Sequence, residues 1–130
     1  IFSVLLVDDE KDFIHTLLKR LERRGLECEG VFCGRDAVER IKARRFDAVL
    51  LDMKLPDMDG NAVLVEMKKV RPDVRVIILT GHASANEGKE GLKNGAVDYL
   101  MKPLEFESLF EKLQTAGSNI NTPADDRREK

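Results

Sequence analysis

Residues 48–52 read Ala-Val-Leu-Leu-Asp, an apolar run that is closed by an acid. The four apolar residues do not alternate with polar ones, which is typical of a strand that is covered on both faces. Strands of that kind belong to parallel sheets with helices packed on each side. The place of Asp52 at the end of such a strand is the starting point for both the fold and the function.

Similar apolar runs occur on both sides of this strand, and segments with helical spacing separate them. The predicted strands are 2–7, 28–32, 48–51, 74–79 and 97–101. The predicted helices are about 11–24 (with Gly25 as the residue that ends it), 35–44, 60–70, 84–95 and 105–116. Strands that alternate with helices in this way predict an α/β domain with a parallel sheet and right-handed crossovers.

Two segments differ from the regular pattern. Residues 84–95 contain Gly88, Gly91 and Gly95. Each interior glycine costs about 1 kcal/mol of helix stability relative to alanine, so we expect a soft helix there. After residue 116 the chain changes to small polar residues and then to mixed charges, which is typical of a linker or an exposed tail. We therefore assign residues 1–116 to one domain and residues 117–130 to a linker or C-terminal tail.

Composition excludes several classes of protein. A length of 130 residues suits one domain. The 22 basic and 24 acidic residues leave a net charge of −2, which lacks the excess of positive charge typical of a domain that binds nucleic acid. No apolar run approaches the roughly 20 residues that cross a bilayer. Cys28 and Cys33 have no second pair and no nearby histidine, so we expect free thiols in the cytoplasm and no zinc site. The chain begins with Ile1, so we expect that its first residues are missing.

Polar residues follow four of the five predicted strands. They are Asp8-Asp9-Glu10 after the first strand, Asp52 at the third, Thr80-Gly81 after the fourth and Lys102-Pro103 after the fifth. The carboxyl ends of parallel strands meet at one edge of the sheet, and ligands bind outside that edge. We therefore expect carboxylates, a hydroxyl and an ammonium in one crevice.

Carboxylates that lie this close repel one another unless a cation lies among them. A set of oxygen ligands without Cys or His selects a hard ion, so we predict Mg²⁺, with Mn²⁺ as a substitute. Asp9 and Asp52 are predicted as direct ligands, and Asp8 as a ligand directly or through a water. The backbone carbonyl of Lys54 would complete the protein's share.

Asp52 is the predicted nucleophile because it ends the central strand and because carboxylates can form an aspartyl phosphate. Lys102 would place a positive charge on a phosphoryl oxygen, and the Thr80 hydroxyl would donate a hydrogen bond to another. Gly81 leaves room for the group to enter.

Less specific interpretations exist for single residues. Asp9 or Glu10 could cap the helix that follows, although capping does not require the other strand-end residues. His82 is interpreted as an exposed loop residue rather than a metal ligand or a base. Tyr99 could be ordinary strand packing, yet alternation along its strand lets it face the segment 84–95.

Together these motifs resemble the receiver domain of two-component response regulators. The matching segments are Val-Asp-Asp-Glu at 7–10, Leu-Asp-Met-Lys-Leu-Pro-Asp-Met-Asp-Gly at 51–60, Leu-Thr-Gly at 79–81 and Asp-Tyr-Leu-Met-Lys-Pro at 98–103. The resemblance covers about residues 2–116 and implies a flavodoxin-like, doubly wound, five-stranded parallel sheet with strand order 2-1-3-4-5 and five helices. It also implies a cis peptide bond between Lys102 and Pro103.

The resemblance implies that Asp52 takes a phosphoryl group, with Mg²⁺, from a sensor histidine kinase or a histidine phosphotransfer protein. Such a domain is not an enzyme, because it assists only its own phosphorylation and dephosphorylation. Thr80 and Tyr99 would form the switch: the hydroxyl moves toward the phosphate, and the ring swings into the vacated space. The face of residues 84–116 would then change shape to control an output, and a homodimer can form through it.

Two other functions fit part of the pattern. An aspartyl-phosphate phosphatase also uses an aspartate and Mg²⁺ on an α/β sheet, but it usually has a second acid two residues after the nucleophile, where this chain has Lys54. A pseudo-receiver would be an interaction module without phosphotransfer, although each group that phosphotransfer requires is present here. Labelling with a small phosphodonor separates the three functions.

Overall fold

The computed structural model describes residues 2–81 and 85–121, with side chains from 2 to 81 and from 86 to 117. Its five strands form one sheet in the order β2-β1-β3-β4-β5, and every neighbouring pair is parallel. The strands are β1 (Ser3–Val7), β2 (Glu27–Val31), β3 (Ala48–Asp52), β4 (Val76–Thr80) and β5 (Asp98–Met101). Their order and direction confirm the doubly wound sheet that the sequence predicts.

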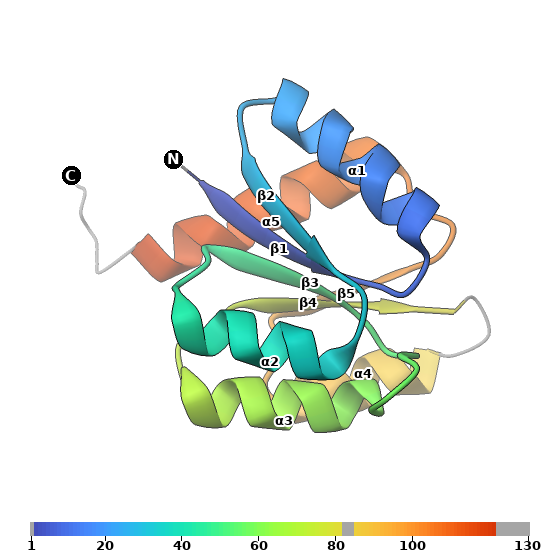
Figure 1. Ribbon diagram of the computed structural model, residues 1–130, viewed down its shortest axis with the longest axis vertical. Coiled ribbons are helices and arrows are strands. Elements are labelled where there is room, and N and C mark those ends of the chain that lie inside the picture. The colour runs from blue at the N-terminus through green and yellow to red at the C-terminus, as the bar shows by residue number, and fades with distance from the viewer. Residues whose placement is uncertain (1, 82–84, 122–130) are drawn as a thin grey trace.

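Helices cover both faces of this sheet (Figure 1). They are α1 (Lys11–Arg23), α2 (Gly34–Ala43), α3 (Gly60–Val70), α4 (Ala85–Lys93) and α5 (Phe106–Asn121). One apolar core joins the sheet to α2 and α3, and the other joins it to α1 and α5. All residues of β1, β3 and β4 are buried, which explains why these strands are apolar without alternation.

Most of the helices begin and end within a few residues of the bounds predicted from the sequence. Gly25 follows α1 with a φ of 89°, as expected for the residue that ends a helix in the left-handed region. Residues 117–121, by contrast, were expected in a linker, and the structure continues α5 to Asn121. Gly117 is buried against the ring of Phe2, where any side chain would collide with it. This glycine therefore permits a tertiary contact and does not interrupt the helix.

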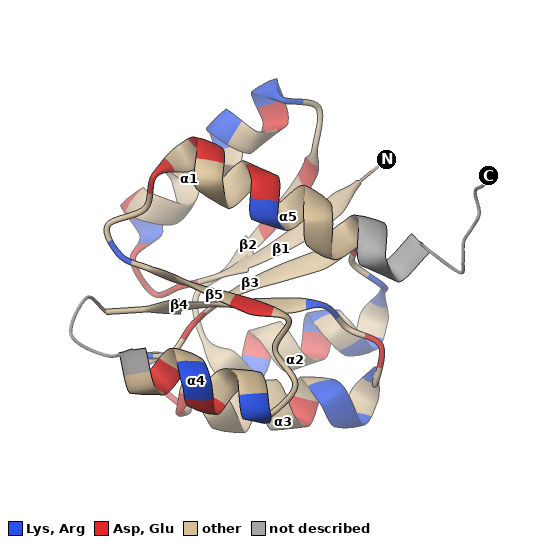
Figure 2. Ribbon diagram, turned by 180° about the vertical axis from the view of Figure 1, so that it is seen from behind, with Lys and Arg blue, Asp and Glu red and all other residues tan. Residues whose placement is uncertain are grey.

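Charged residues are spread over the helices, where Lys and Arg are mixed with Asp and Glu (Figure 2). This distribution agrees with a net charge close to zero. Among the described residues, no helix combines the length and the apolar character that spanning a membrane requires.

Helix α4 packs closely on the sheet through its glycines. A Cβ atom at Gly88 would lie 2.5 Å from Cδ2 of Tyr99, and one at Gly91 would collide with Ile78. Gly95 lies beyond the helix, with a φ of 108°. The glycines at positions 88 and 91 therefore allow close approach to β4 and β5, in addition to lowering the intrinsic helix propensity.

We predict that Gly88→Ala destabilises the protein, although alanine is the better helix former by about 1 kcal/mol. The added methyl group meets the ring of Tyr99, and overpacking of this kind costs about 1–3 kcal/mol. We expect a net loss of about 1 kcal/mol in the free energy of unfolding, measured with urea. Lys89→Ala, at an exposed position of the same helix, should change it by less than about 0.5 kcal/mol. Stabilisation by Gly88→Ala would contradict the packing argument.

Candidate functional site

The sheet brings the predicted site residues to one edge. Val7 of β1 pairs with Leu51 of β3, so the residues that follow them, Asp8 and Asp52, lie side by side at the carboxyl ends of adjacent strands. The connections leave in opposite directions between β1 and β3, which makes this crevice the topological switch point of the sheet. Thr80 ends β4, and its carbonyl accepts a hydrogen bond of 2.9 Å from the N–H of Lys102.

Three carboxylates gather in this crevice. Oxygen atoms of Asp8, Asp9 and Asp52 all lie within 4.8 Å of one another. Asp8 is fully buried and Asp52 is only 7% exposed, whereas Asp9 is open to solvent. Oxygen ligands alone, partly buried and with one open side, suit a hard divalent cation that keeps some of its water. The cluster could therefore hold a metal ion, as the sequence predicts.

Lys102 lies among these acids. Its Nζ is 2.9 Å from Oδ2 of Asp8, 3.1 Å from Oε1 of Glu10 and 3.8 Å from Oδ2 of Asp52. Burial by itself lowers the pKa of Lys102, but the hydrogen bonds to Asp8 and Glu10, together with attraction by Asp52 and Asp8, raise it above its ordinary value. The side chain is therefore a permanent positive charge in the crevice.

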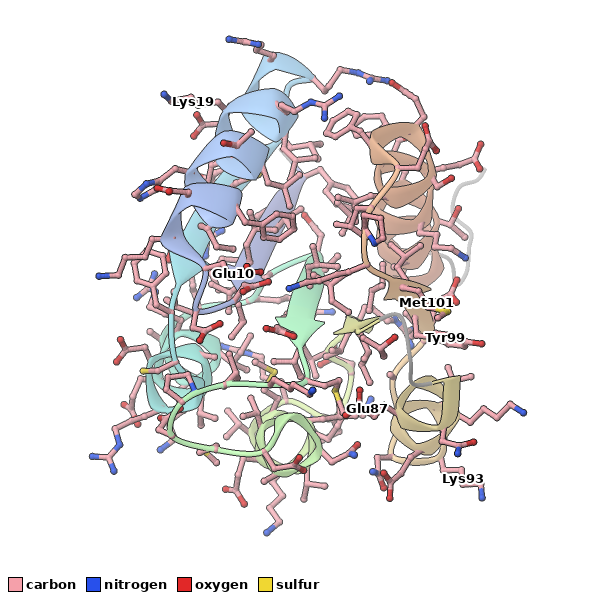
Figure 3. All side chains as sticks on the ribbon, turned by 90° about the vertical axis from the view of Figure 1, so that its right-hand side faces the viewer. Glu10, Lys19, Glu87, Lys93, Tyr99 and Met101 are labelled. Carbon is pink, nitrogen blue, oxygen red and sulfur yellow. The ribbon has the colours of Figure 1, made fainter. Side chains whose placement is uncertain are left out.

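Glu10 has a role that sequence reasoning did not assign to it. The residue is the N-cap of α1, yet its side chain makes no capping hydrogen bond and instead accepts one from Lys102. Figure 3 looks onto this edge of the sheet, with Glu10 near its centre and with Tyr99 and Met101 on the side of α4 and α5. Capping therefore does not explain why Glu10 follows the first strand.

The hydroxyl group of Thr80 is fully buried, and its Oγ1 has no hydrogen-bond partner among the described residues. An unpaired buried polar group costs about 1–3 kcal/mol, so such a group invites an explanation. Thr80 ends β4, the strand next to β3, which ends in Asp52, so the predicted role of the hydroxyl toward a bound group stays a prediction. An incoming oxyanion would satisfy this hydroxyl.

The pKa of Asp52 is raised to about 6. Burial is the largest cause and repulsion by Asp8 the next, while attraction by Lys102 and the N–H of Lys54 partly offset them. That N–H donates to Oδ1 of Asp52 at 3.3 Å. The ionised form of Asp52 is therefore disfavoured by burial and by Asp8, even in the presence of the Lys102 ammonium, and a bound cation would favour it.

Two further expectations concern the surroundings of the site. The peptide bond between Lys102 and Pro103 is cis, as expected. Tyr99 is half-buried, and its ring lies against Gly88 of α4, which agrees with a side chain that faces the segment 84–95. His82 lies outside the described residues.

Comparison with known proteins identifies the family. The family described as "Response regulator receiver domain" matches residues 4–114. The chain belongs to this family. The match covers the five strands except Ser3 at the start of β1, and it includes every strand-end residue of the crevice.

Individual relatives agree with this assignment. The receiver domain is 39% identical to transcriptional regulatory protein ZraR of Escherichia coli over 114 residues, which are 88% of this chain and 26% of that protein. The chain thus spans about a quarter of the curated relative's length. It superimposes on a CheY-like receiver domain from Methanospirillum hungatei with a TM-score of 0.87 and 32% identity, over 92% of this chain and 96% of that one.

A third relative is a response regulator from Burkholderia pseudomallei, whose structure is described as containing a phosphorylated aspartic acid, a calcium ion and citrate. It has a TM-score of 0.81 and 32% identity to this receiver domain, over 92% of this chain and 71% of that one.

We predict that the raised pKa of Asp52 makes stability depend on pH. Between the ordinary value of 3.8 and about 6, the folded protein binds more protons than the unfolded chain at this carboxyl, so its contribution to stability falls as pH rises. Asp52→Asn keeps the shape and removes the charge. In the presence of a chelator, we expect the variant to unfold at pH 7 with a free energy about 1–2 kcal/mol higher than the wild type.

The measurement is urea unfolding at several pH values, and the quantity of interest is the difference between variant and wild type. This difference should grow from pH 4 to pH 7. The control is Asp73→Asn. Asp73 is an exposed carboxylate in the segment before β4, where it forms an ion pair with Arg45, and the difference of this variant from the wild type should not grow with pH. A difference for Asp52→Asn that is constant with pH would contradict the assignment.

Proposed function

We propose that this receiver domain accepts a phosphoryl group on Asp52 from the phosphohistidine of a sensor histidine kinase or a histidine phosphotransfer protein. It then changes conformation and controls an output in the cytoplasm. The observation that carries the proposal is the crevice itself, where Asp52 lies between two further carboxylates, the Lys102 ammonium and the unpartnered Thr80 hydroxyl. The relative with a phosphorylated aspartic acid and a calcium ion supports it.

The proposed ion is Mg²⁺, for which Mn²⁺ can substitute. Asp8, Asp9, Asp52 and the backbone carbonyl of Lys54 would hold it. When bound, the ion neutralises charge on the phosphoryl oxygens. The residues present fit this ion, because the donors are oxygens and because one carboxylate of the cluster, that of Asp9, is open to water.

The protein's own groups contribute position and charge. A carboxylate oxygen of Asp52 attacks phosphorus, the bond from phosphorus to the donor's imidazole nitrogen breaks, and that nitrogen leaves with the electron pair. Lys102 is placed to attract a phosphoryl oxygen, since its Nζ already lies 3.8 Å from Oδ2 of Asp52. The buried Thr80 hydroxyl, which has no hydrogen-bond partner in the described part of the chain, can donate to another oxygen.

This chemistry stops at one phosphoryl group per chain, so the domain is a phosphoacceptor rather than a phosphatase with turnover. A phosphatase of this type would need an acid two residues after Asp52, and the chain has the exposed Lys54 there. The output would be delivered by the longer protein, as the name of ZraR suggests for a relative of which this chain spans 26%.

We predict that a small phosphodonor, acetyl phosphate with Mg²⁺, labels the wild type to about one phosphate per chain and that a chelator prevents it. Asp52→Asn should remove the label, and Lys102→Ala should slow labelling by about 10²-fold, because each loses a group that acts on the transferring phosphate. Asp73→Asn is the control and should label normally. Mass spectrometry of the intact protein measures the result. Absence of label on the wild type would favour a pseudo-receiver, and turnover of many donor molecules would favour a phosphatase.

The proposed switch joins Thr80 to Tyr99 and the face of residues 84–116. When the hydroxyl moves to the phosphate, the space beside it becomes available to the ring of Tyr99, which now lies against Gly88 of α4. The same face exposes two large apolar side chains, Leu92 at 41% and Met101 at 40%. We propose that the phosphorylated domain pairs with a second copy through this face.

The dimer is tested by sedimentation of the protein with Mg²⁺ and beryllium fluoride as the phosphate mimic. We expect the mimic to shift the wild type toward a dimer and Leu92→Lys to weaken dimerisation by about tenfold or more, because it places a charge in an apolar contact. Val65→Lys, on the exposed face of α3 at 39% exposure, is the matched control and should dimerise normally. Equal behaviour of the two variants would contradict this interface.

A further inference from the structure

Helix α2 begins without a cap of its own. Its N-cap residue, Cys33, has extended backbone angles but makes no side-chain hydrogen bond to the helix. The first-turn amides are instead bound from a distant loop: the N–H groups of Gly34 and Arg35 donate to Oδ1 and Oδ2 of Asp57 at 2.8 and 3.0 Å. A carboxylate from 23 positions further along the chain thus takes the role that a capping side chain normally has.

Asp57 lies in the loop 53–59, which connects the phosphoacceptor to α3. The ends of this loop are held by backbone hydrogen bonds. The N–H of Met53 donates to the carbonyl of Leu79 at 3.2 Å, and the N–H of Gly60 donates to the carbonyl of Met53 at 3.0 Å. Between these two ends, Asp57 fastens the loop to α2.

The contact between α2 and the loop is closely packed. A Cβ atom at Gly34 would lie 2.7 Å from Cγ2 of Val63 in α3 and 3.0 Å from Sδ of Met58 in the loop, so a larger residue at the start of α2 would force these side chains to shift. The hydrogen bonds from the N–H groups of Arg35 and Gly34 also lower the pKa of Asp57, which is therefore ionised at neutral pH. Packing and charge together hold the loop against the helix.

We propose that Asp57 is a positioning residue for the metal ion: by binding the N-terminus of α2, it holds in place the loop that carries the carbonyl of Lys54, whose N–H donates to Oδ1 of Asp52 at 3.3 Å. The inference rests on the proposed function, which makes that carbonyl a ligand. Asp57 itself is exposed and three residues away from Lys54, so it acts only through the loop. Helix α2, which contributes no ligand, then determines part of the affinity for the ion.

The expected change in Mg²⁺ affinity on replacing Asp57 is estimated from residues that orient metal ligands in other proteins. Residues that orient metal ligands change metal affinity by about 10- to 100-fold when they are replaced. The lower end applies here, because Asp57 is open to solvent and because the other ligands do not depend on it. Asn can still accept one of the two N–H groups, so its effect should be smaller than that of Ala.

The experiment compares Asp57→Ala and Asp57→Asn with Asp36→Ala and Asp36→Asn. Asp36 is an exposed acid in the first turn of α2, so its replacement removes the same charge from the same region without releasing the loop. The first readout is the dissociation constant for Mg²⁺, obtained by titrating the unphosphorylated protein while following its amide NMR signals. The second is hydrogen exchange at the amides of Gly34 and Arg35 in the presence of a chelator.

We expect Asp57→Ala to weaken Mg²⁺ binding by about tenfold and Asp57→Asn by about threefold, with faster exchange at both amides. The Asp36 variants should stay within about twofold of the wild type, as expected for loss of an exposed charge. In acetyl phosphate labelling, the Mg²⁺ concentration for half-maximal rate should rise for Asp57→Ala while the rate at saturating Mg²⁺ stays within about twofold.

A purely structural role would give a different result. In that case Asp57→Ala would speed exchange and lower stability but leave the Mg²⁺ dissociation constant equal to that of Asp36→Ala, which would overturn the inference. Failure of the proposed function is a separate outcome, because the wild type itself would then take no label from acetyl phosphate.

Discussion

The constraint on which the rest of the site depends is the crowding of three carboxylates beside the Lys102 ammonium. The parallel register places Asp8 and Asp52 next to one another at the ends of β1 and β3, where burial makes their repulsion stronger than it would be in water. Burial of Asp52 and, after it, repulsion by Asp8 raise the pKa of Asp52 to about 6, although Lys102 offsets part of the effect. The folded domain thus holds a local excess of negative charge that a divalent cation is suited to balance.

The scaffold tolerates this excess because the centre of its sheet is apolar and buried. Strands β1, β3 and β4 are buried throughout and are covered by helices on both faces. Stability gained there offsets both the repulsion among the acids and the unpaired hydroxyl of Thr80. The buried polar residues Asp8, Asp52 and Thr80 lie at or just after the carboxyl ends of strands, so the energetic cost of the site is separated from the core that supports it.

Prediction from sequence succeeded where a local pattern carries the information. Apolar runs without alternation indicated the strands, and the order of strands and helices indicated the parallel sheet, which by itself brings the strand ends together. The pattern was misleading where a residue serves a distant contact. Gly117 resembled the start of a linker, but it lies inside α5. It is a glycine there because the ring of Phe2 occupies the place of a side chain. Glu10 resembled a helix cap, but its carboxylate reaches Lys102, 92 positions away.

The sequence by itself determined the α/β class, the extent of the sheet and the set of residues at its functional edge, because periodicity and the polar residues at strand ends are local properties of the chain. Only the tertiary structure decided how these residues affect one another: the raised pKa of Asp52, the isolation of the Thr80 hydroxyl and the bond from Asp57 to the start of α2. These features depend on distances between segments far apart in the chain and on the exclusion of water around them. Neither these distances nor the exclusion of water can be predicted from the spacing of residues along the chain.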